Sequence, residues 1–346
     1  MTLSLEQLRR CHVAVDLGAS RTRVYLKHQG LIVDEPSVAS VNTHTGALIA
    51  VGTLAERMAG RTPEHIRVVR PVSGGTVVDI DMAQRMLRFL IGDKVRRAWR
   101  RKPSLRAAVC VPHEAEPLAQ RAAVETMTGL GARRVELVDT LIAAAVGCGL
   151  PVEQAEATMI VVCGAATTQV AVLSLGAIVA AEKVPLGGDA IDHAVVQHLR
   201  NAHELVLPSQ GLRPLHQALG GSGPDGWEGW AGTEVHGRDV STGCARSVRV
   251  DSREVREAIH TPLTAVLDSI GRVLRLCPPD LVADLGDRGV MLAGGSARLP
   301  GLDKMLRAAT GMPVHVARNA DVCAVEGLGS MLEGRIKPLA LDPITT

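Results

Sequence analysis

One stretch of this chain occurs twice. Residues 13–26 (VAVDLGASRTRVYL) have the layout of residues 159–172 (MIVVCGAATTQVAV): an apolar run, a turn of small residues and a second apolar run. Gly18 aligns with Gly164 and Thr22 with Thr168, in each case 146 residues later. Runs rich in β-branched residues that end at glycine are typical of two β-strands joined by a tight turn. The repeat therefore predicts a duplicated architecture in which two such hairpins face each other.

Turns made of small residues have a chemical use. They expose consecutive backbone N–H groups with no side chain in the way, so two facing turns suit a polyphosphate held from both sides. A third small-residue turn, Gly294–Ala297, follows an apolar strand and precedes a helix, which suits the base or ribose of a nucleotide. Each turn alone also fits an ordinary hairpin. The three together favour a nucleotide-binding fold.

The rest of the chain alternates strand-like and helical patterns, which predicts an α/β protein. Buried strands are expected at 107–111 and 135–138, where short apolar runs occur. Amphipathic helices are expected at 83–98 and 253–275, where apolar residues recur with helical spacing. Residues 207–250 show the least regular pattern, and the segment 220–232 within them is expected to be a glycine-rich loop.

Composition excludes several classes of protein. With 346 residues, 46% hydrophobic and 21% charged, the chain can build a large core in two domains and is not disordered, collagen-like or a small disulfide scaffold. Its seven cysteines are scattered without a C-x-x-C pair, which favours a reduced, cytoplasmic compartment. Residues 157–181 are uncharged and long enough to span a bilayer, but the polar turn in their middle favours two strands.

Several short motifs occur in a fixed order along the chain. They are Asp16-Leu-Gly18 with Thr22, Glu35-Pro-Ser-Val38, Gly60-Arg-Thr-Pro63, Val109-Cys-Val-Pro112, Ala143-Ala-Ala-Val-Gly147, Gly187-Gly-Asp189, Cys277-Pro-Pro279, Gly294-Gly295 and Gly301-Leu-Asp303. In this order they resemble the bacterial actin homologues that determine rod shape, the MreB/Mbl family. The resemblance extends from about residue 12 to residue 335.

The resemblance implies the actin/Hsp70/sugar-kinase superfold, with two duplicated RNase H-like domains around a cleft. Domain I would comprise residues 1–150 plus 319–346, with a small subdomain at about 32–66. Domain II would comprise residues 151–318, with a small subdomain at about 190–251.

The resemblance also implies that the cleft binds ATP and Mg²⁺. Asp16 would hold the metal through water. The residues that would contact the nucleotide are Asp16, Gly18, Ala19, Ser20, Arg21, Thr22, Gly164, Ala165, Ala166, Thr167, Arg213, His216, Gly294, Gly295, Ser296 and Ala297.

The chain departs from the family pattern at the positions that support hydrolysis. Val162 replaces the second aspartate of the metal shell, and Ala165 and Ala166 replace glycines beside the phosphates. Thr140 stands where the family has the acid that orients the attacking water, and His216 lies where a charged adenosine contact is expected. Loss of a metal carboxylate or of a water-orienting acid costs on the order of 10²-fold in rate each. We therefore expect weak ATP binding and at most a weak ATPase, with no intact catalytic residue.

The function implied by the resemblance is structural. The chain would form or join actin-like filaments, with itself or with paralogous subunits, at the inner face of the cell membrane, and would organise cell-wall synthesis and cell or spore shape. The alternative is a small-molecule, sugar-type kinase of the same superfold. That enzyme needs an intact metal site and a carboxylate base, and Val162 and Thr140 argue against both.

The strongest charge run lies at residues 94–106, which contain seven basic and no acidic side chains. In the resembled family the loop at this place carries residues that dip into the membrane, so Trp99, Arg100 and Arg101 are predicted membrane contacts. An indole suits the headgroup level, and each cation adds roughly 1 kcal/mol on an anionic leaflet. The alternative is a solvated helix end. Nucleic acid is disfavoured, because the run offers one aromatic ring for stacking.

Two further patterns indicate surface features. His193, His198 and His203 recur every five residues, which does not place them on one helical face, so they are predicted to be surface histidines rather than metal ligands. Met1, Leu5 and Leu8 share a helical face near the N-terminus, with two arginines beside it at 9–10. We interpret this segment as a frayed tail, with a short interfacial helix as the alternative.

Overall fold

The molecule is built around two five-stranded sheets of the same design. The computed structural model describes residues 5–100, 105–208, 211–212, 215, 232–299 and 301–336, with only the backbone of 93–100 and 252. The first sheet has the order β10-β9-β1-β2-β3 and the second the order β18-β17-β11-β12-β13. The first sheet consists of β1 (Val13–Leu17), β2 (Arg21–Leu26), β3 (Gly30–Pro36), β9 (Arg106–Val111) and β10 (Arg134–Asp139). The second consists of β11 (Thr158–Cys163), β12 (Thr168–Ser174), β13 (Ala177–Val184), β17 (Val290–Ala293) and β18 (Val314–Val316).

The predicted duplication therefore extends from the hairpins to whole sheets. In each sheet three antiparallel strands are followed by two parallel ones. Val13 of β1 pairs with Ala107 of β9, and Met159 of β11, 146 residues later, pairs with Val290 of β17. The strands expected at 107–111 and 135–138 are confirmed within a residue at each end.

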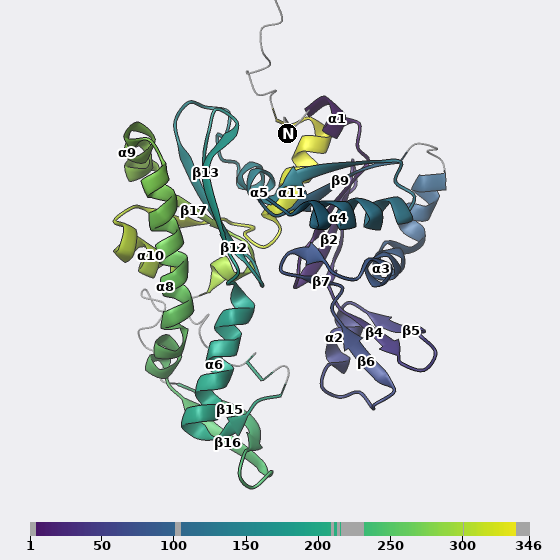
Figure 1. The fold of residues 1–346 in the computed structure, drawn as a ribbon, viewed down its shortest axis with the longest axis vertical. Helices are drawn as coiled ribbons and strands as arrows, with labels where there is room; N and C mark the ends of the chain where they lie inside the picture. Colours follow the sequence, from purple (N-terminus) through teal and green to yellow (C-terminus); the bar gives the residue numbers. More distant parts are fainter. Residues whose placement is uncertain are drawn as a thin grey trace, which may run out of the picture.

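Helices cover both sheets (Figure 1). On the first half, α3 and α4 pack on each other and bury the apolar face of the first sheet. On the second half, α8 packs against β12, β13 and α6. The expected helix at 83–98 is confirmed but is interrupted at Gly92, where φ is +49°. The helices of the two halves are α3 (Ile80–Arg100), α4 (Pro117–Gly129), α6 (Gly188–His203), α8 (Ser252–Leu276), α9 (Pro279–Arg288) and α10 (Leu302–Thr310).

Two helices lie side by side between the halves (Figure 1). They are α5 (Thr140–Gly147), which follows the first sheet's last strand, and α11 (Cys323–Glu333), which follows the second sheet's last strand. Their contact is reciprocal: a Cβ on Gly147 would collide with the carbonyl of Cys323, and a Cβ on Gly327 would collide with the carbonyl of Ala143. Glycine at both positions lets the two backbones touch.

The N-terminal segment differs from the expected frayed tail. Residues Leu5–Arg9 form a short helix, α1, which contacts α11. Leu8 is fully buried in the core shared with α5 and α11. The leucine pattern therefore reflects burial of a hydrophobic side chain against α11.

Each half carries a small three-stranded sheet at its lower end in Figure 1. The sheet of the first half is formed by β4 (Ala39–Asn42), β5 (Leu48–Val51) and β6 (Ile66–Val69), beside α2 (Thr53–Met58). That of the second half is formed by β14 (Leu205–Val206), β15 (Thr233–Asp239) and β16 (Ala245–Val250). The division into domains and subdomains by residue number stays a prediction.

The hairpin β15–β16 lies within 207–250, the least regular part of the sequence, and residues 220–231 of the expected glycine-rich loop lie outside the described residues. Within these strands only Val235, Asp239 and Val250 are buried, so the alternating apolar pattern that marks a strand is weak. A helix long and apolar enough to cross a membrane does not occur in the part of the chain that the structure describes.

Candidate functional site

A cavity of about 360 Å³ opens between the two halves. That size is within the range of small-ligand sites. All three small-residue turns of the sequence meet here. The predicted nucleotide contacts that line the cavity are Asp16, Gly18, Ala19, Ser20, Arg21, Gly164, Ala165, Ala166, Thr167, Gly294, Gly295 and Ser296. A second cavity of about 310 Å³ adjoins it, shares Ser20, Ala165, Gly295 and Ser296, and extends towards the start of α6.

The two hairpin turns have the same backbone geometry. The amide of Gly18 donates to the carbonyl of Arg21 (3.1 Å), and that of Gly164 donates to the carbonyl of Thr167 (2.9 Å). A Cβ on Gly18 would lie 2.8 Å from the Arg21 oxygen, and one on Gly164 would lie 2.9 Å from the Thr167 oxygen. Both distances are shorter than a real Cβ atom tolerates, so each turn requires glycine at its first position.

Free backbone donors remain at the tip of each turn. The N–H groups of Ala19, Ser20, Ala165 and Ala166 have no hydrogen-bond partner among the described residues, and all four residues line the cavity. Such unpaired, consecutive amides are the donors that a phosphate requires.

The third turn fixes the second one in place. The 3₁₀ helix η1 (Gly295–Arg298) follows β17, and the Ser296 hydroxyl donates to the Gly164 carbonyl (3.0 Å). From the start of α6, the amides of Gly188 and Asp189 donate to the carbonyls of Gly164 and Ala165 (3.0 and 2.8 Å). These bonds hold the carbonyl side of the turn and leave its amide side for a ligand.

The first hairpin carries a charged network behind its turn. The Arg23 guanidinium, 9% exposed, lies 3.1 Å from Asp34 and 3.9 Å from both Asp16 and Asp321. Asp34 also accepts from Arg21 (2.6 Å), and Asp321 pairs with Arg298 (2.9 Å). Burial raises the pKa of Asp16; the charge of Arg23 lowers this pKa and that of Asp34 raises it further.

The second hairpin is uncharged at the equivalent place. Asp16 pairs across the strands with Arg23, whereas Val162 pairs with Gln169. The Gln169 side chain accepts a hydrogen bond from the amide of His113 (2.7 Å), and the His113 ring lies 2.6 Å from Asp139. Val162 is buried and lines the cavity.

The position where the family has the water-orienting acid is likewise occupied by an uncharged residue, Thr140. The Thr140 hydroxyl donates to the carbonyl of Val111 (2.8 Å). The neighbouring Asp139 caps α5 by accepting from the amide of Leu141 (2.8 Å) and does not line the cavity. The carboxyl groups that line the cavity are Asp16 and Asp321, and both lie beside guanidinium groups.

This donor set does not fit a bound Mg²⁺. Mg²⁺ in phosphate sites is held by one or two carboxylates and waters. Asp16 is the one predicted ligand present; burial disfavours its charged form, and Arg23 already contacts it. Val162 supplies no donor, and Asp321, the other carboxyl group of the cavity, already pairs with Arg298, so the phosphate cradle lacks a matching metal shell.

Some predicted residues lie elsewhere. Thr22 is fully buried and shares a hydrogen bond with the Ser37 hydroxyl (2.8 Å), and Ala297 is buried next to the cavity without lining it. Arg213, His216 and Arg101 lie outside the described residues, and of Trp99 and Arg100 the backbone alone is described.

Sequence reasoning did not find Arg23, Gln169, His113 or Asp321. Hairpin register could have found the first two, because in each hairpin the seventh residue after Asp16 or Val162 lies opposite it on the next strand. His113 and Asp321 reach the site from distant elements, and no local pattern marks them.

Comparison with known proteins identifies the relatives of this fold. The MreB/Mbl protein family model matches residues 10–339. The chain belongs to the MreB/Mbl family. It is 36% identical over 325 residues to the cell shape-determining protein MreB of Escherichia coli strain K12, covering 93% of each chain.

Solved structures agree on the actin-like fold of this MreB/Mbl chain. MreB5 of Spiroplasma citri bound to ADP superimposes with a TM-score of 0.84 at 25% identity, over 91% of this chain and 94% of that one. The MamK double helical filament is similar in fold, with a TM-score of 0.73 at 18% identity over 94% and 99% of the two chains.

Proposed function

We propose that this MreB/Mbl protein is an actin-like subunit that binds a nucleotide through its backbone and hydrolyses it slowly or not at all. One observation carries the proposal: both turns present unpaired amides to one cavity, while Val162 and Thr140 occupy the positions of the second metal aspartate and of the water-orienting acid. Phosphoryl transfer depends on positioned metal and water, whereas backbone binding does not.

The related MreB5 of Spiroplasma citri binds ADP, which supports a nucleotide in the equivalent cleft here. The shared fold and family support assembly into filaments, with itself or with a paralogous subunit, in the control of cell shape and cell-wall synthesis. A subunit that hydrolyses slowly would persist in such a filament.

The test combines binding, turnover and sedimentation of the purified chain. We expect weak ATP binding by calorimetry that changes little when Mg²⁺ is chelated, and phosphate release at background. Filaments that pellet with ATP or with a non-hydrolysable analogue alike would support assembly without turnover. Tight, Mg²⁺-dependent binding or rapid phosphate release would refute the proposal, and turnover with a sugar acceptor would favour the kinase alternative. Thr140→Glu alone is expected to leave phosphate release at background, because the metal shell stays incomplete.

We further propose that the segment around Trp99, Arg100 and Arg101 contacts the inner face of the membrane, on the basis of its seven cations. Binding to anionic vesicles should weaken with salt, since exposed charges are screened over about 8–10 Å. Trp99→Ala should weaken flotation with such vesicles, and Arg100→Glu with Arg101→Glu should nearly abolish it. The matched control is Arg133→Glu with Arg134→Glu, which makes the same charge change at two other exposed arginines. Equal flotation of all four proteins would show that the segment is a solvated surface.

A further inference from the structure

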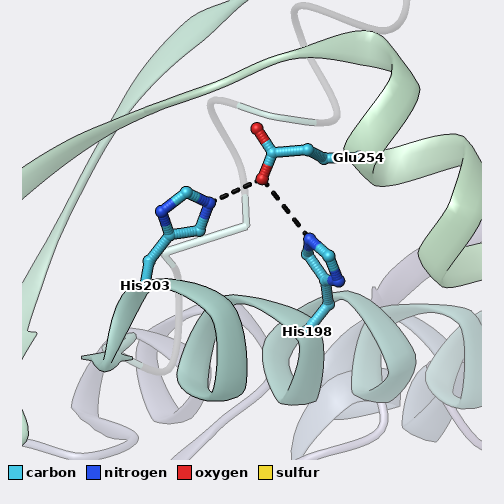
Figure 2. Close-up of side chains that lie close together, drawn as sticks. All are labelled: His198, His203 and Glu254. Atoms are coloured by element: carbon cyan, nitrogen blue, oxygen red, sulfur yellow. Dashed lines mark hydrogen bonds and ion pairs between the residues drawn. The ribbon is translucent and has the colours of Figure 1, made fainter.

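Outside the nucleotide cleft, three side chains of the types that bind metals lie close together (Figure 2). His198 and His203 of α6 both point their Nε2 atoms at one oxygen, Oε2 of Glu254 on α8, at 3.4 and 2.5 Å. The three ligand atoms all lie within 4.8 Å of one another. None of the three residues lines the cleft cavities. The expected surface position holds in part, since His198 and His203 are 27% and 23% exposed, but the two rings share one carboxylate.

Sequence spacing misses this cluster because its third member comes from another helix. Five residues along α6 turn the two histidines to different sides of the helix, but His203 is the last residue of α6, and α8 begins beside it. Glu254 then lies between the two rings (Figure 2).

The glutamate is oriented before any ligand binds. It is the third residue of α8 and closes a capping box, in which Asp251 accepts from the amides of Arg253 and Glu254 (2.8 and 2.9 Å). Oε1 of Glu254 accepts in return from the amide of Asp251 (3.4 Å), which leaves Oε2 for the histidines. At the other side, the carbonyl of His203 accepts from Arg246 of β16 (3.2 Å). The capping bonds thus orient Glu254, and the bond from β16 holds the backbone of His203.

We propose that His198, His203 and Glu254 form a site for a divalent transition metal, best suited to Zn²⁺. Two imidazole nitrogens and one carboxylate oxygen are a ligand set of zinc, with a water as the fourth ligand. The side chains are 27%, 23% and 26% exposed, so one side of the cluster is open to that water. In a tetrahedral site with bonds of 2.0–2.1 Å the ligand atoms stand ~3.3 Å apart, close to the His198–Glu254 spacing. Small rotations of the three side chains would bring all the ligand atoms to this spacing.

Harder cations do not suit this cluster. Mg²⁺ and Ca²⁺ require several oxygen ligands, and the cluster offers one carboxylate. A bound metal would link the C-terminal part of α6, which contacts β14 of the small sheet β14-β15-β16, to the first turn of α8. The site would stabilise this part of the second half, independently of what the cleft binds.

The experiment uses the full chain after treatment with a chelator. Zinc is titrated against a chromophoric competitor, and Co²⁺ is added separately to record its visible spectrum. We expect one metal per chain, a tetrahedral Co²⁺ spectrum, a rise in melting temperature with Zn²⁺, and no displacement by excess Mg²⁺. Mass spectrometry of untreated protein for bound metal gives a second readout.

The variants separate ligation from folding. His198→Gln and His203→Gln keep a hydrogen-bonding side chain beside Glu254 but should lower zinc affinity by at least ~10²-fold each, since each removes a direct ligand. Glu254→Gln keeps a side-chain oxygen for the capping box and should lower affinity as well. His193→Ala, at an exposed histidine of the same helix, is the matched control and should bind like the parent.

Two results would overturn the proposal. The first is zinc affinity of the parent no higher than that of the His198→Gln/His203→Gln double variant. The second is an equal loss in His193→Ala, which would indicate adventitious binding to surface histidines. Should the substitutions unfold the chain, an octahedral Co²⁺ spectrum of the parent would refute the site, and a tetrahedral one would support it.

Discussion

In the hairpin β1–β2 the residue pair behind the turn is Asp16 and Arg23, whereas in β11–β12 the equivalent pair is Val162 and Gln169. The turns themselves are alike: each closes through a glycine amide and each leaves its next two amides unpaired. Around Arg23, Asp34 and Asp321 extend the charged network. The Gln169 side chain instead accepts from the backbone amide of His113, whose ring lies beside Asp139.

This difference separates two tasks of a nucleotide cleft. The backbone turn depends on glycine and on strand register, and both copies keep it. The side-chain chemistry that binds metal depends on single carboxylates, and one copy lacks it. Binding through amides can therefore persist after hydrolysis is lost, which is the state that we propose for this protein.

The largest expected effect is from removing the charge that the first hairpin has and the second lacks. Arg23→Gln leaves the Asp16 carboxylate, whose side chain is 17% exposed, without its buried cation, while Asp34 and Asp321 keep Arg21 and Arg298. Breaking a buried ion pair costs about 3 kcal/mol of unfolding free energy. The loss should shrink at acidic pH, because Asp16 then takes up a proton. Urea denaturation measures it, with Gln169→Ala as the comparison, expected to cost about 1–2 kcal/mol. Equal losses of unfolding free energy in the two variants would contradict a special role for the Asp16–Arg23 ion pair.

The next effect tests what the two hairpins share. Gly18→Ala and Gly164→Ala each place a Cβ under 3 Å from a carbonyl oxygen of the same turn. Each should cost about 1–3 kcal/mol and weaken nucleotide binding, and the two costs should agree closely. The control is Gly286→Ala in α9, where nothing lies within 4 Å and helix propensity favours alanine. A large cost in one hairpin alone would show that the turns are not equivalent.

A smaller effect is expected from giving the second hairpin the family's chemistry. Val162→Asp with Ala165→Gly and Ala166→Gly should raise ATP affinity in Mg²⁺ about tenfold, equal to about 1.4 kcal/mol. The same protein should lose this gain with a chelator, because the new carboxylate acts through the metal. Titration calorimetry measures both values. The triple variant with Val162→Asn is the matched control; an equal gain there would indicate relief of crowding alone.

The sequence predicted most of the backbone and less of the chemistry. The 146-residue repeat predicted both hairpins, since strand period and turn glycines are local signals. The glycine contact between Gly147 and Gly327 was not predicted, because it joins helices that are far apart in the chain.

The side-chain contacts of both sites were not predicted for the same reason. Asp321 reaches Arg23 from the turn before α11, His113 reaches Gln169 from the turn after β9, and Glu254 reaches the histidines from α8. Each depends on how separate elements pack. Such contacts carry no periodic signal in a single sequence.

The smallest expected effect is a pH dependence that one hairpin has and the other lacks. Burial raises the pKa of Asp16 in the folded protein above its unfolded value. The folded state thus favours the protonated form, so this stabilisation is fully present below about pH 4 and is lost as the pH rises through the raised folded pKa. Asp16→Asn does not titrate, so its unfolding free energy relative to the parent should increase over that pH range and then level off.

Urea denaturation of parent and Asp16→Asn at a series of pH values from about 4 to 7 measures this difference. The control is Val162→Asn at the equivalent position of the second hairpin, whose difference from the parent should stay constant with pH, since neither residue ionises there. Arg23 limits the size of the Asp16 effect, because its guanidinium favours the charged carboxylate. A difference for Asp16→Asn that is flat with pH would mean that Arg23 balances burial, and a difference that falls as the pH rises would mean that Arg23 outweighs it. The first hairpin would then hold Asp16 ready as a metal ligand, and the contrast with Val162 would become one between a working half-site and a missing one.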